Sequence, residues 1–153
     1  MRYQSAGVES RQIAVVTLQN DSQEAGVELL VSEALRHEIL QRGGLELVSD
    51  PDDADLKLSG RVLPVRTRSR SFTGVVLARE YEVTLRLDLR VDSAAPDVRS
   101  MEREEFEASE IYLASADAAV LRKNRREALR YLSGLLARRI HDSIDRNVLG
   151  VLQ

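Results

Sequence analysis

The chain has 153 residues, of which 43% are apolar and 31% are charged, a composition that suits one globular domain spanning residues 1–153. Its 22 basic and 25 acidic side chains give a net charge of −3, so the overall charge does not favour nucleic-acid binding. Tryptophan is absent and aromatic residues make up 4%, which argues against a surface for base stacking. The absence of cysteine excludes thiol catalysis, disulfides and thiolate metal sites within this sequence.

The first half of the chain predicts a strand, a helix and a second, brief strand. The β-branched and apolar run at 13–18 is typical of a strand that is covered on both faces. Asp21 and Glu24 have the spacing of a capping box, and apolar residues then recur at helical spacing, so we expect a helix from about 23 to 42. Gly43 follows as the left-handed cap that ends this helix.

The second half predicts three antiparallel strands and one long helix. Apolar and polar residues alternate over 56–62 until Pro64 interrupts them, and they alternate again, without a fault, over 81–91. Residues 99–112 form a third strand, which makes a meander of the three. From Asp117 the apolar period returns to 3.6 and predicts a helix of about 30 residues.

The alternation along the strands determines the expected architecture. A sheet with one apolar and one polar face needs cover on one side only, and two amphipathic helices are available to supply it. We therefore predict an α/β two-layer sandwich, in which a mixed sheet of about four strands carries both helices on one face. The far face is left to water or to a partner, and its residues are Thr84, Arg86, Asp88 and Arg90.

Catalytic and metal-binding motifs are not found in the sequence. The two histidines, His37 and His141, each have only an isolated carboxylate four residues away as a second metal-type ligand. No phosphate loop, dinucleotide fingerprint or nucleophile elbow occurs. We therefore expect a protein that is not an enzyme and that uses no metal or other cofactor.

Residues 56–79 contain six basic and no acidic side chains, and their centre is a row of alternate arginines. Arg66, Arg68 and Arg70 would project from one face of a strand as rigid forks suited to phosphate or carboxylate, and Arg79 follows them. In the alternative interpretation, these arginines balance the acidic strand at 102–110 through cross-strand pairs.

A second basic group lies on the predicted long helix. Its members are Arg122, Lys123, Arg125, Arg126 and Arg130. Such a group more often forms the exposed face of a helix than a binding site, and this is the interpretation that we favour for it.

Several short phrases occur in an order that matches a known family. The phrases are Ile13-Ala14-Val15 with Asn20, Leu35-Arg36-His37-Glu38-Ile39-Leu40, Ala54-Asp55-Leu56-Lys57-Leu58-Ser59-Gly60, Arg79-Glu80-Tyr81-Glu82-Val83, and Arg125-Arg126-Glu127-Ala128 leading to Leu135-Leu136-Ala137-Arg138-Arg139-Ile140. With them the chain resembles the LptE-type lipopolysaccharide-assembly lipoproteins of the Gram-negative outer membrane, over nearly its whole length.

The resemblance implies a protein at the periplasmic side of the outer membrane, held there by a lipid on an N-terminal cysteine. It implies a plug within the β-barrel of the partner LptD, which binds lipopolysaccharide and helps the barrel to assemble. Basic residues on the sheet would contact lipid A phosphates, so Arg66, Arg68, Arg70 and Arg79 are the candidates. Met1-Arg2-Tyr3 stands where family members begin with the cysteine, and we expect the anchor to precede these residues in the native protein.

Two other functions remain open at this point. A periplasmic accessory lipoprotein domain that regulates a cell-wall enzyme or a secretion assembly also opens with strand, turn and helix, as residues 15–22 do. The meander followed by one terminal helix favours the LptE-type interpretation. A cytoplasmic ligand-binding or catalytic α/β protein is the third possibility.

Overall fold

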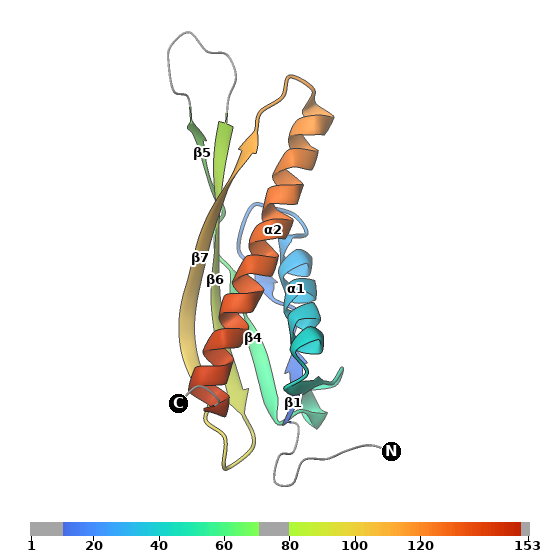
Figure 1. The fold of residues 1–153 in the computed structure, drawn as a ribbon, viewed down its shortest axis with the longest axis vertical. Helices are drawn as coiled ribbons and strands as arrows, with labels where there is room; N and C mark the ends of the chain where they lie inside the picture. Colours follow the sequence, from blue (N-terminus) through green and yellow to red (C-terminus); the bar gives the residue numbers. More distant parts are fainter. Residues whose placement is uncertain (1–10, 71–79, 151–153) are drawn as a thin grey trace.

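The computed structural model describes residues 11–70 and 80–150, which form an elongated molecule (Figure 1). Its strands are β1 (Arg11–Val15), β2 (Gln19–Asn20), β3 (Leu45–Leu47), β4 (Leu56–Val62), β5 (Arg66–Arg70), β6 (Glu80–Ser93) and β7 (Met101–Leu113). Its helices are α1 (Val27–Arg42) and α2 (Ala118–Ile144), with a 3₁₀ turn η1 (Pro51–Asp53) and a π-helical turn η2 (Asp145–Leu149).

All seven strands belong to one mixed sheet in which β6 is the central element. The order β3-β1-β4-β6 continues to β7 on the other side of β6, and β1 runs parallel to both β3 and β4. The strands β4, β6 and β7 are antiparallel neighbours, which confirms the predicted meander.

The expected number of about four strands is wrong, although the mixed α/β class is confirmed. The reason is the length of β6, whose residues 87–93 pair with β4 while residues 80–84 pair with β5 along the same edge. Pro64 separates β4 from β5, since it cannot donate a hydrogen bond to a ladder. The other extra strand, β2, has two residues and is too short to leave an alternating pattern, whereas β3 is the brief strand that was predicted after the first helix.

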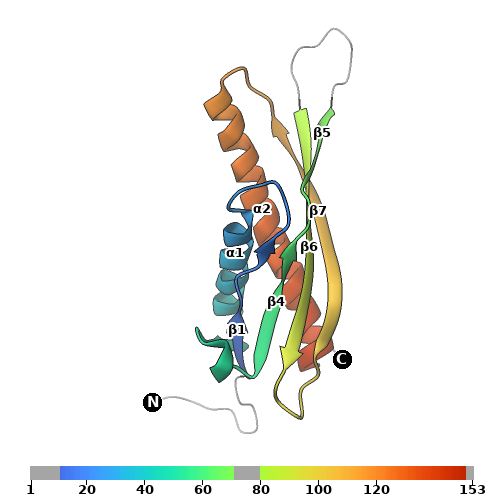
Figure 2. The same cartoon turned by 180° about the vertical axis from the view of Figure 1, so that it is seen from behind.

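Both helices lie on the same side of the curled sheet, as the two opposite views show (Figures 1 and 2). The apolar positions of β6 point to this side, and their side chains are completely buried: Val83, Leu85, Leu87, Leu89 and Val91. Complete burial of each such side chain stabilises the fold by about 1.5–3 kcal/mol. The helix-covered face is therefore the hydrophobic core, and the opposite, open face carries the polar residues of each strand.

The helix α1 begins later than the capping-box pattern predicts. It starts at Val27, after Gly26 with a left-handed φ of 82°, and no side chain caps it. Asp21 instead forms an ion pair with Arg61 at 3.2 Å, because the two lie on neighbouring strands β2 and β4 or directly after them. The predicted end of the helix at Gly43, with φ of 73°, is confirmed.

The helix α2 begins where it was predicted, and its first part extends beyond the end of α1 (Figures 1 and 2). Asp117 caps it by accepting a hydrogen bond from the Ala119 amide at 2.9 Å. Its first buried side chain is that of Ala128, so residues 118–127 form an overhang of about 15 Å. Within residues 11–70 and 80–150, no helix combines the length and the apolar composition that crossing a membrane requires.

Candidate functional site

The register of β5 against β6 places the predicted arginine row on the open face of the sheet. The pairs are Arg66 with Thr84, Arg68 with Glu82 and Arg70 with Glu80. Thr67 and Ser69, between the arginines, pair with the helix-facing Val83 and with Tyr81. Arg79, the fourth predicted member, lies outside the described residues.

Within this row the arginines differ in their contacts. Arg68 forms an ion pair with Glu82 of β6 at 2.6 Å. The Arg66 side chain is exposed and forms no hydrogen bond or ion pair with the described part of the chain. Together with Thr84, these three side chains line a shallow depression of about 210 Å³. An anion placed there would meet the free guanidinium of Arg66 and would share that of Arg68 with a carboxylate.

The acidic strand at 102–110, which the alternative interpretation made the partner of the arginine row, does not lie next to that row. Residues 102–110 belong to β7, which pairs with the opposite edge of β6. Arg68 of the row pairs with Glu82 of β6 and not with β7, so charge balance by β7 does not explain the arginines.

Thr84 and Arg86, two of the four residues predicted on the open face, lie there and contact β7. The Thr84 hydroxyl is 2.7 Å from that of Ser109, and Arg86 is 3.6 Å from Glu105. These contacts join polar side chains of β6 and β7 that point to the open face.

Asp88 and Arg90, the other two, differ strongly in exposure. Asp88 is only 8% exposed, because Arg61 from β4 and Arg103 from β7 extend over its carboxylate at 3.6 and 3.1 Å. Arg90 lies at the irregularity in the β6–β7 register and forms an exposed ion pair with Asp92 at 3.3 Å. A partner approaching this face would therefore meet three guanidinium groups before it met the Asp88 carboxylate.

These charges line a second depression, of about 400 Å³, between the β1–β2 connection and the lower half of β6. Arg61, Arg90 and Arg103 contribute three positive charges to it, and Asp88 contributes one negative charge. The Oδ1 atom of Asp88 is buried without a hydrogen-bond partner among the described residues. The depression thus presents guanidinium groups to a ligand, whereas the Asp88 carboxylate lies beneath them.

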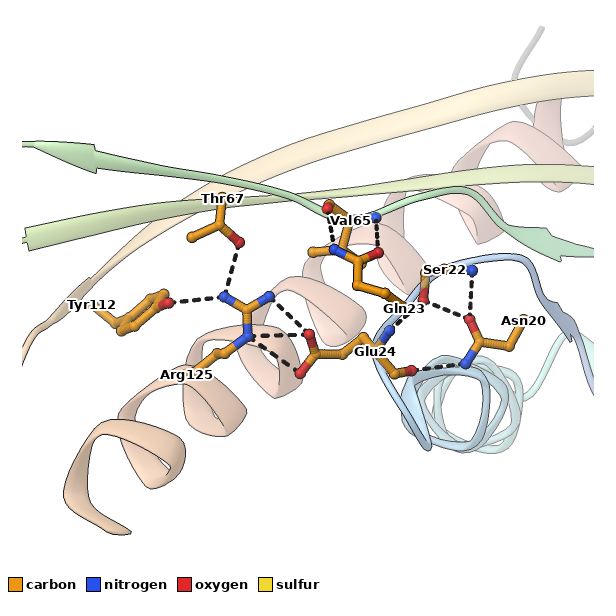
Figure 3. A network of polar contacts seen from close by, with 8 residues as sticks. All are labelled: Asn20, Ser22, Gln23, Glu24, Val65, Thr67, Tyr112 and Arg125. Atoms are coloured by element: carbon orange, nitrogen blue, oxygen red, sulfur yellow. Dashed lines mark hydrogen bonds and ion pairs between the residues drawn. The ribbon is translucent and has the colours of Figure 1, made fainter. Parts of the chain in front are cut away.

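One arginine of the helix group fixes the position of β5 from the other side of the sheet (Figure 3). The Nη1 atom of Arg125 donates to the Thr67 hydroxyl at 2.9 Å and to the Tyr112 hydroxyl at 2.8 Å. Its Nε and Nη2 atoms donate to the Glu24 carboxylate at 3.1 and 2.8 Å. Burial alone would lower the pKa of Arg125, but the hydrogen bonds that its guanidinium donates to Glu24 and Tyr112 outweigh this effect and raise the pKa. The guanidinium is therefore charged and joins α2 to β5, β7 and the segment before α1.

The segment before α1 also holds the start of β5 directly. The Gln23 amide donates to the Val65 carbonyl at 2.7 Å and accepts from the Val65 amide at 3.3 Å (Figure 3). Asn20 keeps this segment in shape by donating to the Glu24 carbonyl at 2.7 Å and accepting from the Ser22 amide at 2.9 Å. Sequence reasoning assigned no role to Gln23 and expected Arg125 to be exposed. The spacing of Asp21 and Glu24 and the presence of Asn20 in the family phrases pointed to this segment, but not to its contacts with β5.

The open face is equipped for binding rather than for a recognisable reaction. Neither histidine lies there, since His37 is on α1 and His141 is buried on α2 at 3.4 Å from Asp145. Among residues 11–70 and 80–150, no three His, Asp or Glu side chains gather in a way that could hold a metal ion. The surface offers guanidinium groups and hydroxyls.

Several solved bacterial structures have a similar fold. The rare lipoprotein B from Shewanella oneidensis is 16% identical, with a TM-score of 0.50 over 84% of this chain and 93% of that one. A minor lipoprotein from Acinetobacter baumannii is 16% identical, with a TM-score of 0.52 over 92% and 94% of the two chains. Protein XCC0632 from Xanthomonas campestris is 15% identical, with a TM-score of 0.54 over 85% and 83%. At these identities the likeness concerns the fold.

The family is shown by the sequence match. The LptE family model, described as lipopolysaccharide-assembly, matches residues 10–144, which include every helix and strand described above. The chain belongs to the LptE family, which is a non-enzymatic lipoprotein family, and the expected resemblance is confirmed. No curated protein matches the chain.

Proposed function

We propose that this protein is a component of the outer-membrane lipopolysaccharide translocon, in which it plugs the LptD β-barrel, assists its assembly and binds lipopolysaccharide. In the native protein a lipid on an N-terminal cysteine would hold it at the periplasmic side of the membrane. The observation that carries the proposal is the arginine row of β5, on the open face of a chain that belongs to the LptE family.

The contacts of the row support the binding of lipopolysaccharide phosphates. The Arg66 side chain is free of partners within the described residues, and the guanidinium fork matches the oxygens of a phosphate. The depression at Arg66 and Arg68 can receive a phosphate, and the larger one can receive a second phosphate at the guanidinium groups of Arg90 and Arg103.

The rest of the open face supports the role of a plug. A barrel lumen is polar, so a protein inside it needs a polar surface rather than an apolar one. Arg86 with Glu105, and Asp88 with its two covering arginines, present groups of both signs whose charges are already largely balanced. Such a surface can form hydrogen bonds to a polar wall without burying an unpaired charge.

Charge reversal of the row tests the lipopolysaccharide site. We expect the triple variant Arg66→Glu, Arg68→Glu, Arg70→Glu to bind immobilised lipopolysaccharide at least about tenfold more weakly in surface plasmon resonance. The thermal transition should stay nearly unchanged, because Arg66 and Arg68 are exposed. The matched control replaces Arg99, Arg130 and Arg138 by Glu, which makes the same change of net charge at exposed positions elsewhere. Unaltered binding by the row variant, or equal loss in both, contradicts the assignment.

Co-expression with the cognate barrel protein tests the plug. We expect a stable one-to-one complex that survives purification in mild detergent. The arginine-row variant should still form it, since many contacts across the surface would contribute. A wild-type protein that fails to co-purify contradicts the plug, whatever its affinity for lipopolysaccharide.

A further inference from the structure

The overhang of α2 (residues 118–127) carries four basic side chains, most of which have no stabilising role in the helix itself. Within residues 118–127 lie Arg122, Lys123, Arg125 and Arg126, and none of the side chains of this segment is buried. Basic residues near a helix N-terminus oppose the macrodipole, and Arg122 and Arg126, four residues apart, repel each other. Only Arg125 is explained by the packing of this molecule, through Glu24, Thr67 and Tyr112.

The remaining basic side chains surround a groove between the N-terminal parts of the two helices. Its volume is about 500 Å³, and its apolar lining includes Val27 and Leu30 of α1 and Leu129 of α2. Arg122 and Arg126 line it as well and have no partner in the described part of the chain, while Lys123 has only a distant one, Glu127 at 3.9 Å. Figures 1 and 2 show the orange end of α2 extending beyond α1, which leaves this part of the helix layer uncovered.

We propose that this groove binds an acidic peptide segment of a partner protein, with one or two apolar side chains on its floor and carboxylates on Arg122, Lys123 and Arg126. Grooves between helices accept amphipathic segments in this way, and arginine forks pair with carboxylates in bidentate geometry. A membrane surface fits less well, because the basic groups surround a concave floor too small for several acyl chains. The proposal goes beyond the function proposed above, since it concerns the helix layer and not the open face of the sheet.

The test uses a defined probe and fluorescence anisotropy. The probe is a fluorescein-labelled peptide of about 15 residues with leucines at helical spacing and glutamates elsewhere. We expect the wild-type protein to bind it, and the double variant Arg122→Glu, Arg126→Glu to bind it about tenfold more weakly. A peptide with glutamine in place of each glutamate should not bind. Leu30→Ser should weaken binding, while Leu40→Ser, on the exposed side of the same helix, should not.

The matched control is Arg99→Glu, Arg138→Glu, which makes the same charge change at exposed positions away from the groove. It should lower the affinity by less than about threefold, as a distant screened charge would. Each variant is first shown to have the wild-type thermal transition. The proposal is overturned if the probe does not bind, if both double variants weaken it equally, or if the groove variant impairs only binding to vesicles of phosphatidylglycerol and phosphatidylcholine. Loss of self-association on ultracentrifugation in that variant alone would assign the groove to a second copy and would also overturn it.

Discussion

The two faces of the sheet are made by the same strands and have opposite chemistry. On the helix-covered face, Leu85, Leu87 and Leu89 of β6 are completely buried, and their burial drives folding. On the open face, Arg86 and Asp88 of the same strand are polar and form ion pairs with Glu105 and Arg103 of β7. The comparison teaches that burial on the covered face supplies the stability of the domain. The residues of the open face are therefore free to serve binding.

The largest expected change in the free energy of unfolding tests whether side chains on the covered face supply most of the stability. Leu132 of α2 is completely buried, so Leu132→Ala should lower the free energy of unfolding by about 2–5 kcal/mol. Ile111→Ala, at a position on the open face that is 38% exposed, should cost less than about 1 kcal/mol. Urea denaturation measures both. A cost at Ile111 as large as that at Leu132 would remove the distinction between the faces.

Substitution of two glycines tests the same contrast between a closely packed and an open position. A Cβ atom at Gly60 would lie 2.1 Å from the Asp88 carbonyl oxygen, so Gly60→Ala should push β4 from β6 and cost about 2–3 kcal/mol. A Cβ at Gly134 of α2 would meet nothing within 4 Å, and Gly134→Ala should stabilise the protein by about 0.5–1 kcal/mol. Thermal unfolding of the two variants should shift in opposite directions. A stable Gly60→Ala variant would mean that the strands are less closely packed than the structure shows.

The helix arginines test which charges are structural. Arg125→Ala should cost about 1–3 kcal/mol, because it leaves the partly buried Glu24 carboxylate unpaired and releases Thr67 and Tyr112. Arg122→Ala should change stability by less than about 0.5 kcal/mol. Hydrogen exchange should also accelerate in β5 for the first variant only. Equal effects of the two substitutions would contradict the role of Arg125 in positioning β5.

The smallest expected effect concerns an exposed pair at the edge of the molecule. The hydrogen bond from Arg11 holds the pKa of Asp97 below its ordinary value of 3.8. Because the folded-state pKa is the lower one, the stabilisation is present above the unfolded-state pKa and disappears as the pH falls through the folded-state value. In a carboxyl ¹³C NMR titration, Arg11→Gln should move the Asp97 midpoint upward. An unchanged midpoint would show that the pair does not persist in solution.

Local patterns in the sequence were sufficient for the elements and for the side of the sheet that is buried. The alternation over 81–91 identified the core positions of β6, because successive side chains of a strand point to opposite faces. Asp117 and Gly43 marked helix ends correctly, since a cap depends on a few neighbouring residues. The arginine row of β5 was predicted for the same reason, as a consequence of the two-residue period.

The tertiary structure alone decided which of the charged residues are free. Arg122 and Arg125 are alike in sequence context, yet only Arg125 meets Glu24, which lies 101 positions away. Asp88 was expected to face a partner, and it is covered by Arg61 and Arg103 because long side chains of neighbouring strands extend over it. Periodicity is a local property of the chain and assigns a residue to a face. Whether that residue is left unpaired depends on side chains brought to it by the register of distant strands, and a binding surface is made of those that remain.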